Sequence, residues 1–169
     1  MANNATGSIS ASVLNDIAKM NIGGTLNYTP ISGDRWLYFE TIADASSTAL
    51  VNAGIQYHEL GVRPDAAEKE TATGDIVRWM CIKHTGTTDG STATSSGVQI
   101  SLAASGSAAY NEVEGFFLDS GDSMIFKTGA TTLNTIGVIT VAVTNGAPVT
   151  GGSPGDVLLQ VAAVMDDVA

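Results

Sequence analysis

Three side chains in this chain are of the types that most often act as a nucleophile, a general base or a zinc ligand: Cys81, His58 and His84. Zinc sites need such residues in clusters, and the only near pair is Cys81 with His84. On a strand, side chains three positions apart point to opposite faces, so these two cannot share an ion. We therefore expect no metal site and no cofactor. Calcium is the metal that is hardest to exclude, because Asp119, Asp122 and Asp156 lie near turns, although no loop has the spacing of an EF-hand. Cys81 is better interpreted as a small buried hydrophobe on the same face as Val77 and Trp79.

Familiar catalytic arrangements are equally hard to assemble. The tripeptide 121–123 reads Gly-Asp-Ser, as in chymotrypsin-like proteases, but Met124 follows where a glycine would form the oxyanion turn. We expect residues 119–122 to form a β-turn that leads into a strand. Glu112 and Glu114 fall on one face of a strand, which is more typical of a solvated surface than of a glycosidase pair. The sequence predicts no catalytic residue, and we expect a protein that is not an enzyme.

The charge of the chain restricts its partners. Seventeen acidic residues against seven Lys and Arg give 169 residues a net charge of −10. Nucleic acids and anionic membrane surfaces attract clustered basic residues, so we expect neither as a partner. The first residues lack the basic and apolar regions of a signal peptide, and no apolar run is long enough for a membrane-spanning helix. We expect synthesis in a cytoplasm.

From residue 34 onward, short apolar segments alternate with turn residues every ten to fifteen positions, which is typical of a β-sandwich or barrel. The predicted strands cover 35–41, 55–60, 76–84, 98–102, 112–118, 123–127, 135–143 and 157–165. The last two are almost continuously apolar and should lie centrally. A helix over 157–165 is the alternative, disfavoured by β-branched residues and a preceding turn. The polar segment 85–97 predicts a surface loop or hairpin tip in which Asp89 forms a turn.

Residues 1–33 differ from the domain at 34–169. Ile9, Val13, Ile17 and Met20 recur at helical spacing, and Gly23 with Gly24 ends the pattern. This spacing predicts an N-terminal arm with a short amphipathic helix. Such a helix is marginal alone, so its apolar stripe should dock either on its own domain or on a partner.

Three stretches carry a resemblance to a known group of proteins. They are residues 45–55 (ASSTALVNAGI), Gly74-Asp75-Ile76 with residues 82–91 (IKHTGTTDGS), and residues 161–169 (VAAVMDDVA). In their overall sequence character and in these short stretches, residues 40–169 resemble the capsid decoration, or cement, proteins of tailed bacteriophages.

The resemblance implies an all-β body, jelly-roll-like or of the β-tulip type, on the outer surface of the virion capsid. It also implies a homotrimer that binds the major capsid protein, bridges adjacent capsomers and stabilises the lattice, after synthesis in the host cytoplasm. An N-terminal arm that orders on the lattice is common in such proteins. Here the partner-binding anchors would be Val13, Leu14, Ile17 and Met20.

A second interpretation is a fibre-associated or carbohydrate-binding β-sandwich module. Its binding platform would use the aromatic side chains, which are few and which a sandwich core would largely consume: Trp36, Tyr38, Phe39, Trp79, Phe116 and Phe117. A sugar binder should display an exposed aromatic platform, whereas a decoration protein should display an exposed apolar arm or rim.

Overall fold

The computed structural model describes residues 4–13, 20–46, 48–57, 70–101, 115–129, 139–144 and 155–167. Within these ranges the regular structure consists of strands, which confirms the predicted all-β class. The strands are β1 (Ala5–Val13), β2 (Met20–Tyr28), β3 (Asp34–Ala43), β4 (Thr48–Ala49), β5 (Ile76–His84), β6 (Gly97–Ser101), β7 (Phe116–Leu118), β8 (Ser123–Lys127), β9 (Thr140–Thr144) and β10 (Val157–Asp166).

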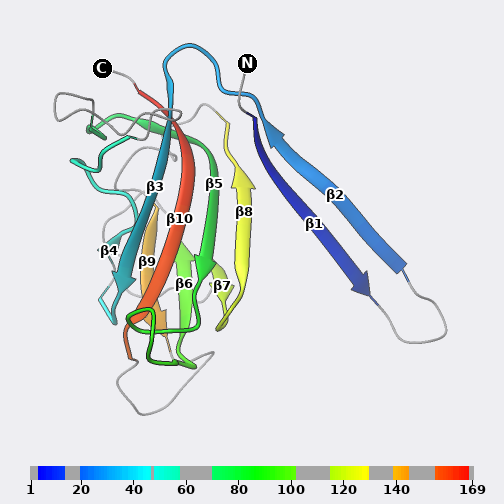
Figure 1. The fold of residues 1–169 in the computed structure, drawn as a ribbon, viewed down its shortest axis with the longest axis vertical. Coiled ribbons are helices and arrows are strands. Elements are labelled where there is room, and N and C mark those ends of the chain that lie inside the picture. The colour runs from blue at the N-terminus through cyan, green and yellow to red at the C-terminus, as the bar shows by residue number, and fades with distance from the viewer. Residues whose placement is uncertain are drawn as a thin grey trace.

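Eight of these strands form two four-stranded antiparallel sheets, in the orders β3-β10-β5-β8 and β4-β9-β6-β7 (Figure 1). The pairing is nested: β3 pairs with β10, β4 with β9, β5 with β8, and β6 with β7. A long antiparallel hairpin that is rolled up produces this order, with β10 then lying beside β5 and β9 beside β6. This is the connectivity of a jelly roll, one of the two body types that the resemblance implied.

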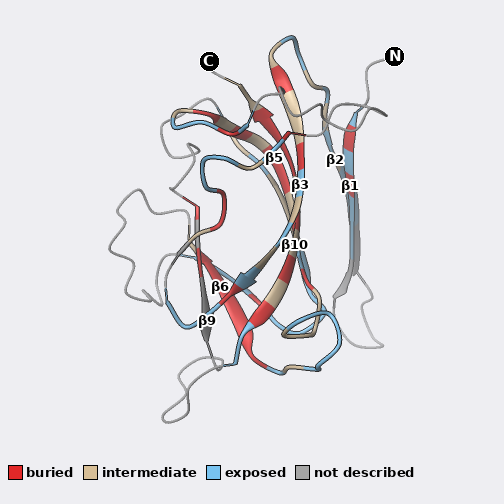
Figure 2. Cartoon of the chain, turned by 60° about the vertical axis from the view of Figure 1, so that its left-hand side comes forward, coloured by how far each residue is buried: buried red, intermediate tan, exposed pale blue. Residues whose placement is uncertain are grey.

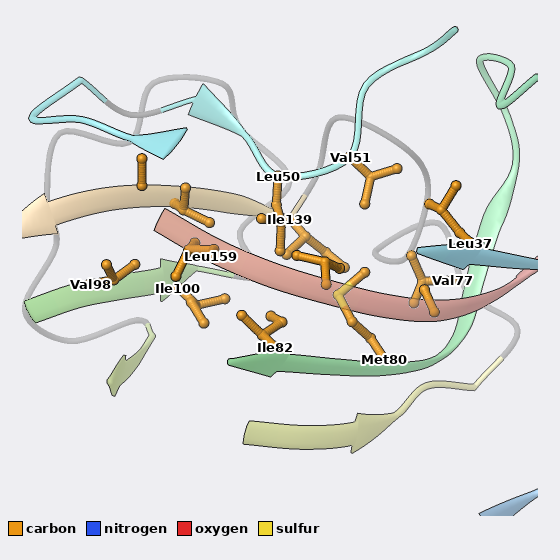
Figure 3. Packing of buried hydrophobic residues seen from close by; sticks show 14 of the residues in the cluster. Leu37, Leu50, Val51, Val77, Met80, Ile82, Val98, Ile100, Ile139 and Leu159 are labelled. Atoms are coloured by element: carbon orange, nitrogen blue, oxygen red, sulfur yellow. The ribbon is translucent and has the colours of Figure 1, made fainter. Parts of the chain in front are cut away.

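The two sheets share one apolar core (Figure 3). On β10 every second residue points into it, from Val157 through Leu159 and Val161 to Ala163, and each of these is fully buried. This alternation follows from the two-residue period of a strand. The helix alternative for residues 157–165 is therefore wrong, and the central position predicted for this strand is confirmed.

A β-bulge in β5 corrects one prediction about side-chain faces. Val164 pairs with Trp79, but the next residue, Met165, pairs with Val77, so Arg78 is an extra residue without a partner on β10. One extra residue reverses the alternation of a strand. Val77 consequently lies in the core between the sheets, whereas Trp79 and Cys81 lie on the outer face. The expected common face of Val77 and Cys81 is wrong for this reason.

The loops confirm the predicted turn chemistry at two places. Asp89 accepts hydrogen bonds from the backbone N–H groups of Ser91 (2.8 Å) and Thr92 (2.7 Å), which makes it a turn former. These backbone hydrogen bonds, with that of Thr92 the largest cause, lower the pKa of its carboxyl. Asp122 donates its N–H to the Asp119 carbonyl at 2.9 Å, closing the expected turn before β8.

Two predicted elements differ from the structure. Around residues 55–57 there is no strand, only an isolated bridge between Gln56 and Glu70, and residues 58–60 lie outside the described ranges. In the N-terminal arm, β1 and β2 form an antiparallel hairpin of nine residue pairs, from Ala5 with Tyr28 to Val13 with Met20. The expected helix is wrong for Ile9, Val13 and Met20, which are strand residues.

The helix prediction for the N-terminal arm failed because apolar residues recur there both at helical spacing and at every second position. Ile9, Ala11 and Val13 also alternate with serines, and β-branched residues favour strands. The pairing with residues 20–28 then satisfies the backbone of both segments, and this non-local contact is invisible to local periodicity. Leu14 and Ile17 lie outside the described residues.

Candidate assembly site: the N-terminal ribbon and its seat

The β1–β2 hairpin, here called the ribbon, stands apart from both sheets of the body. It forms a two-stranded sheet of its own, whose described strands pair only with each other. Its base, at Ala5 and Tyr28, lies beside the body, and its other end, at Val13 and Met20, reaches away from β8 (Figure 1). The ribbon is therefore an appendage held by side-chain contacts.

The base of the ribbon lies on the outer face of the β3-β10-β5-β8 sheet. On this face, residues that lie side by side on the neighbouring strands form rows across the sheet. Two adjacent rows consist mostly of apolar residues. We call these residues the seat: Trp36, Val164 and Trp79 from one row, and Ala162, Cys81 and Ile125 from the next. The next row along this sheet is polar, and there the Gln160 side chain donates to Glu40 at 2.9 Å. This polar row separates the seat from a further apolar pair on the same face, Ile42 and Leu158, where Ile42 is 54% exposed.

Apolar contact between the ribbon and the seat buries groups on both sides. Ala5 on β1 is 1% exposed, and Trp79 and Val164 below it are 5% and 0% exposed. Leu26 and Tyr28 on β2 pack on the same cluster. Figure 2 shows buried residues at the base of the ribbon. Burial of this kind supplies most of the free energy that holds two surfaces together.

Gly7 on β1 makes the closest approach to the seat. A Cβ at this position would lie 3.0 Å from Ile125 Cγ2 and 3.4 Å from Cγ1, and closer still to Cδ1. A larger side chain could be accommodated only if the ribbon lifted or Ile125 moved. The opposite behaviour is found at Gly24, where nothing lies within 4 Å of the position of a Cβ. A side chain at position 7 would thus need Ile125 or the ribbon to shift, whereas one at position 24 would not.

Polar contacts fix the end of β2 beside the seat. Tyr28 donates its hydroxyl to Asp34 Oδ2 at 2.7 Å, and the same oxygen accepts the Ile31 N–H at 2.8 Å. Burial, the hydrogen bond to Asp34 and the negative charge of that carboxylate raise the pKa of Tyr28 to about 12. Lys127 on β8 donates to the Asn27 carbonyl at 3.0 Å, with its ammonium 5.5 Å from the centre of the Tyr28 ring. This distance permits a cation–π attraction.

Several buried polar atoms in or near the seat and the segment that connects β2 to β3 (residues 29–33, here called the joint) have no partner. In the described part of the chain these are Trp79 Nε1, Arg78 Nε and Asp34 Oδ1. Arg78 nevertheless forms an ion pair with Asp166 through its terminal nitrogen. An unpaired buried polar atom costs about 1–3 kcal/mol. The apolar gain from docking the ribbon is therefore partly offset.

Further apolar side chains are exposed on the ribbon, the joint and the body. Ile9, beyond the seated base, is 54% exposed, and Ile31 in the joint is 65% exposed. On the edge strand β7, Phe116 is 50% and Phe117 is 42% exposed, although the Phe117 ring fills the space beside Gly97. Both an apolar projection and exposed aromatic side chains are thus present.

The predicted partner-binding residues are only partly brought together. Val13 and Met20 are cross-strand partners at the far end of the described ribbon, and Leu14 and Ile17 fall outside the described residues. Sequence reasoning missed Gly7, Tyr28 and Ile125, whose importance depends on non-local contacts. A signal was available nonetheless: the run from 76 to 82 is apolar on both strand faces, which indicates that something covers the outer one.

The histidine and the cysteine that the structure describes, His84 and Cys81, do not form a common site. His84 is fully buried: its Nε2 lies 2.8 Å from the Ser96 carbonyl, and its Nδ1 accepts the Gly86 N–H at 2.9 Å, so both ring nitrogens hold the loop at 85–96. Cys81 is half-buried in the seat, and burial raises the pKa of its thiol. The two side chains point to opposite faces, as predicted, and His58 lies outside the described residues.

Glu112 and Glu114 also lie outside the described residues. In the ranges that the structure describes, no group of three or more His, Cys, Asp or Glu residues could hold a metal ion. Those ranges likewise contain no helix that is long and apolar enough to cross a membrane.

Comparison with known proteins gave no family, relative or fold neighbour. No protein-family model, no curated protein and no solved structure matches this chain. The class of the protein is therefore defined by its own structure, as an all-β protein with two antiparallel sheets in jelly-roll order and an N-terminal β-ribbon docked on one outer face.

Proposed function

We propose that this chain is a structural virion protein that binds the outer surface of a tailed-phage capsid as a homotrimer. In this proposal it contacts the major capsid protein, bridges adjacent capsomers and stabilises the lattice. The observation that carries the proposal is the ribbon. It is anchored at its base on the seat, and the remainder of its described length extends beyond the body with Ile9 exposed.

The chemistry of the ribbon suits attachment to another protein. Its described strands pair only with each other, so both outer edges present backbone N–H and C=O groups. An exposed edge of this kind can pair with a strand of a partner, and side chains that alternate along it supply specificity. An isolated two-stranded ribbon is marginally stable, so it gains from being covered. These features support a bridging role.

A rigid body with a projecting ribbon also suits binding at repeated lattice sites. Attachment through the body and through the ribbon makes each subunit bivalent, and association of three subunits multiplies the contacts. The net charge of −10 keeps the free subunit soluble before assembly. Jelly rolls serve in capsid proteins, but they also serve in lectins, so the fold alone does not decide the function.

The alternative function, a fibre-associated or carbohydrate-binding module, is favoured by one observation. Tyr38 is 50% exposed on the outer sheet face, next to the partly buried Trp36, and Phe116 and Phe117 are exposed on β7. Sugars stack on aromatic rings of this kind. However, these side chains lie on different sheets, and Trp79 is covered by the ribbon, so they do not form one platform.

The test is co-sedimentation of the purified chain with expanded phage heads that lack a decoration protein. We expect saturable binding, with a mass of protein per head that matches the number of symmetry-related lattice sites. Heads that remain bare at saturating protein concentrations would contradict the capsid role. In that case, a change in tryptophan fluorescence on addition of glycans would support the carbohydrate-binding alternative.

A further inference from the structure

We propose that the seat also accepts the ribbon of a second copy of this chain, so that copies associate by exchanging ribbons. The inference concerns self-association through a defined surface and does not depend on the capsid as a partner. It is carried by the way the ribbon is attached, by the joint that follows it and by the fit between the ribbon and the seat.

The first step is the nature of the attachment. Within the described residues, the ribbon shares no strand pairing with the body, and its base is held by side-chain packing and by two hydrogen bonds, from Lys127 to the Asn27 carbonyl and from the Tyr28 hydroxyl to Asp34. The ribbon of another copy can make every one of these contacts. When two copies exchange ribbons, the contacts between ribbon and seat are therefore kept, and the two copies become associated.

The second step is the joint between β2 and β3, residues 29–33. Pro30 fixes its own φ angle and restricts Thr29 to extended conformations, which favours an open path. Gly33 has φ of +99°, a value that glycine adopts readily, so the chain can change direction there. Ile31 in the same joint is 65% exposed. Little apolar burial is lost when this joint opens.

The third step is the state of the polar groups around the joint. Asp34 Oδ1 and Arg78 Nε are buried without a partner while the ribbon lies on its own body. Such unsatisfied buried groups next to the joint reduce the stability of the closed form, because each would be satisfied by water in a form that exposed it. Opening is opposed by the hydrogen bonds that Asp34 Oδ2 accepts from Tyr28 (2.7 Å) and from the Ile31 N–H (2.8 Å). It is also opposed by backbone hydrogen bonds from Asp34 N–H to the Ile31 carbonyl (3.1 Å) and from Asp167 N–H to the Gly33 carbonyl (3.2 Å).

The fourth step identifies the occupant. The Ile125 side chain occupies the space where a Cβ at position 7 would lie, and Gly7 leaves this space free. The described strands of the ribbon, Ala5–Val13 and Met20–Tyr28, contain no charged residue, so a foreign ribbon brings no like charge to the seat of an acidic body. A second copy of the chain has the same glycine and the same uncharged ribbon strands, so it meets both requirements.

The experiment uses a disulfide between the ribbon and the seat. A Cβ at position 7 would lie 3.0 Å from Ile125 Cγ2, which places the two Cβ atoms within about 4.5 Å, inside the range of disulfides. The variant is Gly7→Cys with Ile125→Cys, in a background of Cys81→Ala because Cys81 pairs with Ile125 across the strands. Copies labelled with ¹⁵N and unlabelled copies are mixed, equilibrated at several concentrations and then oxidised.

We expect a substantial fraction of the linked peptides to join one heavy and one light chain, and this fraction to rise with protein concentration. The matched control replaces Gly7→Cys with Gly24→Cys, on the same ribbon but with no atom within 4 Å, and should give at least tenfold less linkage. Links found only within single chains would overturn the proposal, as would a linkage yield no greater than the control.

Light scattering of the wild-type chain provides a second measurement that needs no substitution. Reciprocal exchange predicts a dimer and cyclic exchange predicts a trimer, each dissociating on dilution, whereas a monomer at all concentrations would contradict exchange. Because neither experiment contains phage heads, a negative result leaves the capsid role to be judged by co-sedimentation, and failed co-sedimentation leaves ribbon exchange unaffected.

Discussion

At the residue scale, Gly7 determines how closely the ribbon approaches the body. We predict that Gly7→Val forces the base of the ribbon away from Ile125, at a cost of about 1–3 kcal/mol of docking free energy. Both tryptophans of the chain, Trp36 and Trp79, belong to the seat, so their fluorescence reports on docking. Acrylamide should quench this fluorescence several times more strongly in Gly7→Val than in the wild type.

The control for this prediction is Gly24→Val. Nothing lies within 4 Å of a Cβ at that position, so quenching should match that of the wild-type chain. Equal quenching in the two variants would show that the contact between Gly7 and Ile125 does not govern docking.

Tyr28 makes ribbon docking sensitive to alkaline pH. Its pKa is about 12 in the folded chain against an ordinary value of 10.0, because of burial first and the hydrogen bond and charge of Asp34 next. A pKa raised on folding gives stability that is complete below pH 10 and is lost as the pH rises toward 12. Tryptophan exposure in the wild type should therefore increase between pH 10 and 12.

The matched variant is Tyr28→Phe, which cannot ionise and lacks the bond to Asp34. Its exposure of the tryptophans should be greater at neutral pH and should change less between pH 10 and 12. An identical alkaline transition in the wild type and in Tyr28→Phe would contradict a role for this hydroxyl.

Some residue-level features could be predicted from the sequence, and the reason is their locality. Asp89 and the turn from Asp119 to Asp122 were predictable because turn chemistry acts over two or three residues. The opposite faces of Cys81 and His84 follow from alternation within one strand. Val77 was misplaced because the bulge at Arg78 depends on the partner strand, which the local sequence does not reveal.

At the element scale, the ribbon behaves as two parts with different surroundings. Its base is covered by the seat, while Ile9 is 54% exposed and lies outside the apolar cluster of the seat. Ile9 pairs with Gly24, and Ser10 with Gly23, so residues 10–23 can be excised in register and replaced by an Asn-Gly turn. This change shortens the ribbon and keeps its base.

We predict that the shortened chain unfolds within about 2 °C of the wild type, because a change of 1 kcal/mol shifts the midpoint of a domain of this size by about 2–4 °C. Its tryptophan quenching should also be unchanged. Thermal unfolding by circular dichroism tests the first point. A midpoint lower by more than about 5 °C would mean that the far part of the ribbon stabilises the body.

The contrast between β10 and the ribbon shows which elements sequence patterns can predict. Residues 157–165 are apolar enough, and rich enough in β-branched residues, that a central strand was the better prediction. Residues 5–13 and 20–28 contain many small and polar residues and no long apolar run, and the pairing of the two segments with each other satisfies their backbones as strands. Their helical spacing was a misleading local signal.

At the scale of the whole molecule, the sandwich could be predicted and the order of its strands could not. Short apolar segments with regular turns indicate two packed sheets, but the nested pairing of β3 with β10 and β4 with β9 joins residues more than ninety positions apart. Nor could the sequence show that the outer face at Trp36 and Trp79 would be covered by the N-terminal ribbon.

The central claim is that the far part of the ribbon attaches this jelly-roll body to a capsid lattice. The most direct measurement compares the binding of the wild-type chain and of the shortened-ribbon chain to the same expanded phage heads by quantitative co-sedimentation. We predict that the wild type saturates the lattice sites and that the shortened chain, although folded, binds at least tenfold more weakly. Equal saturation and equal affinity of the two chains would contradict the claim.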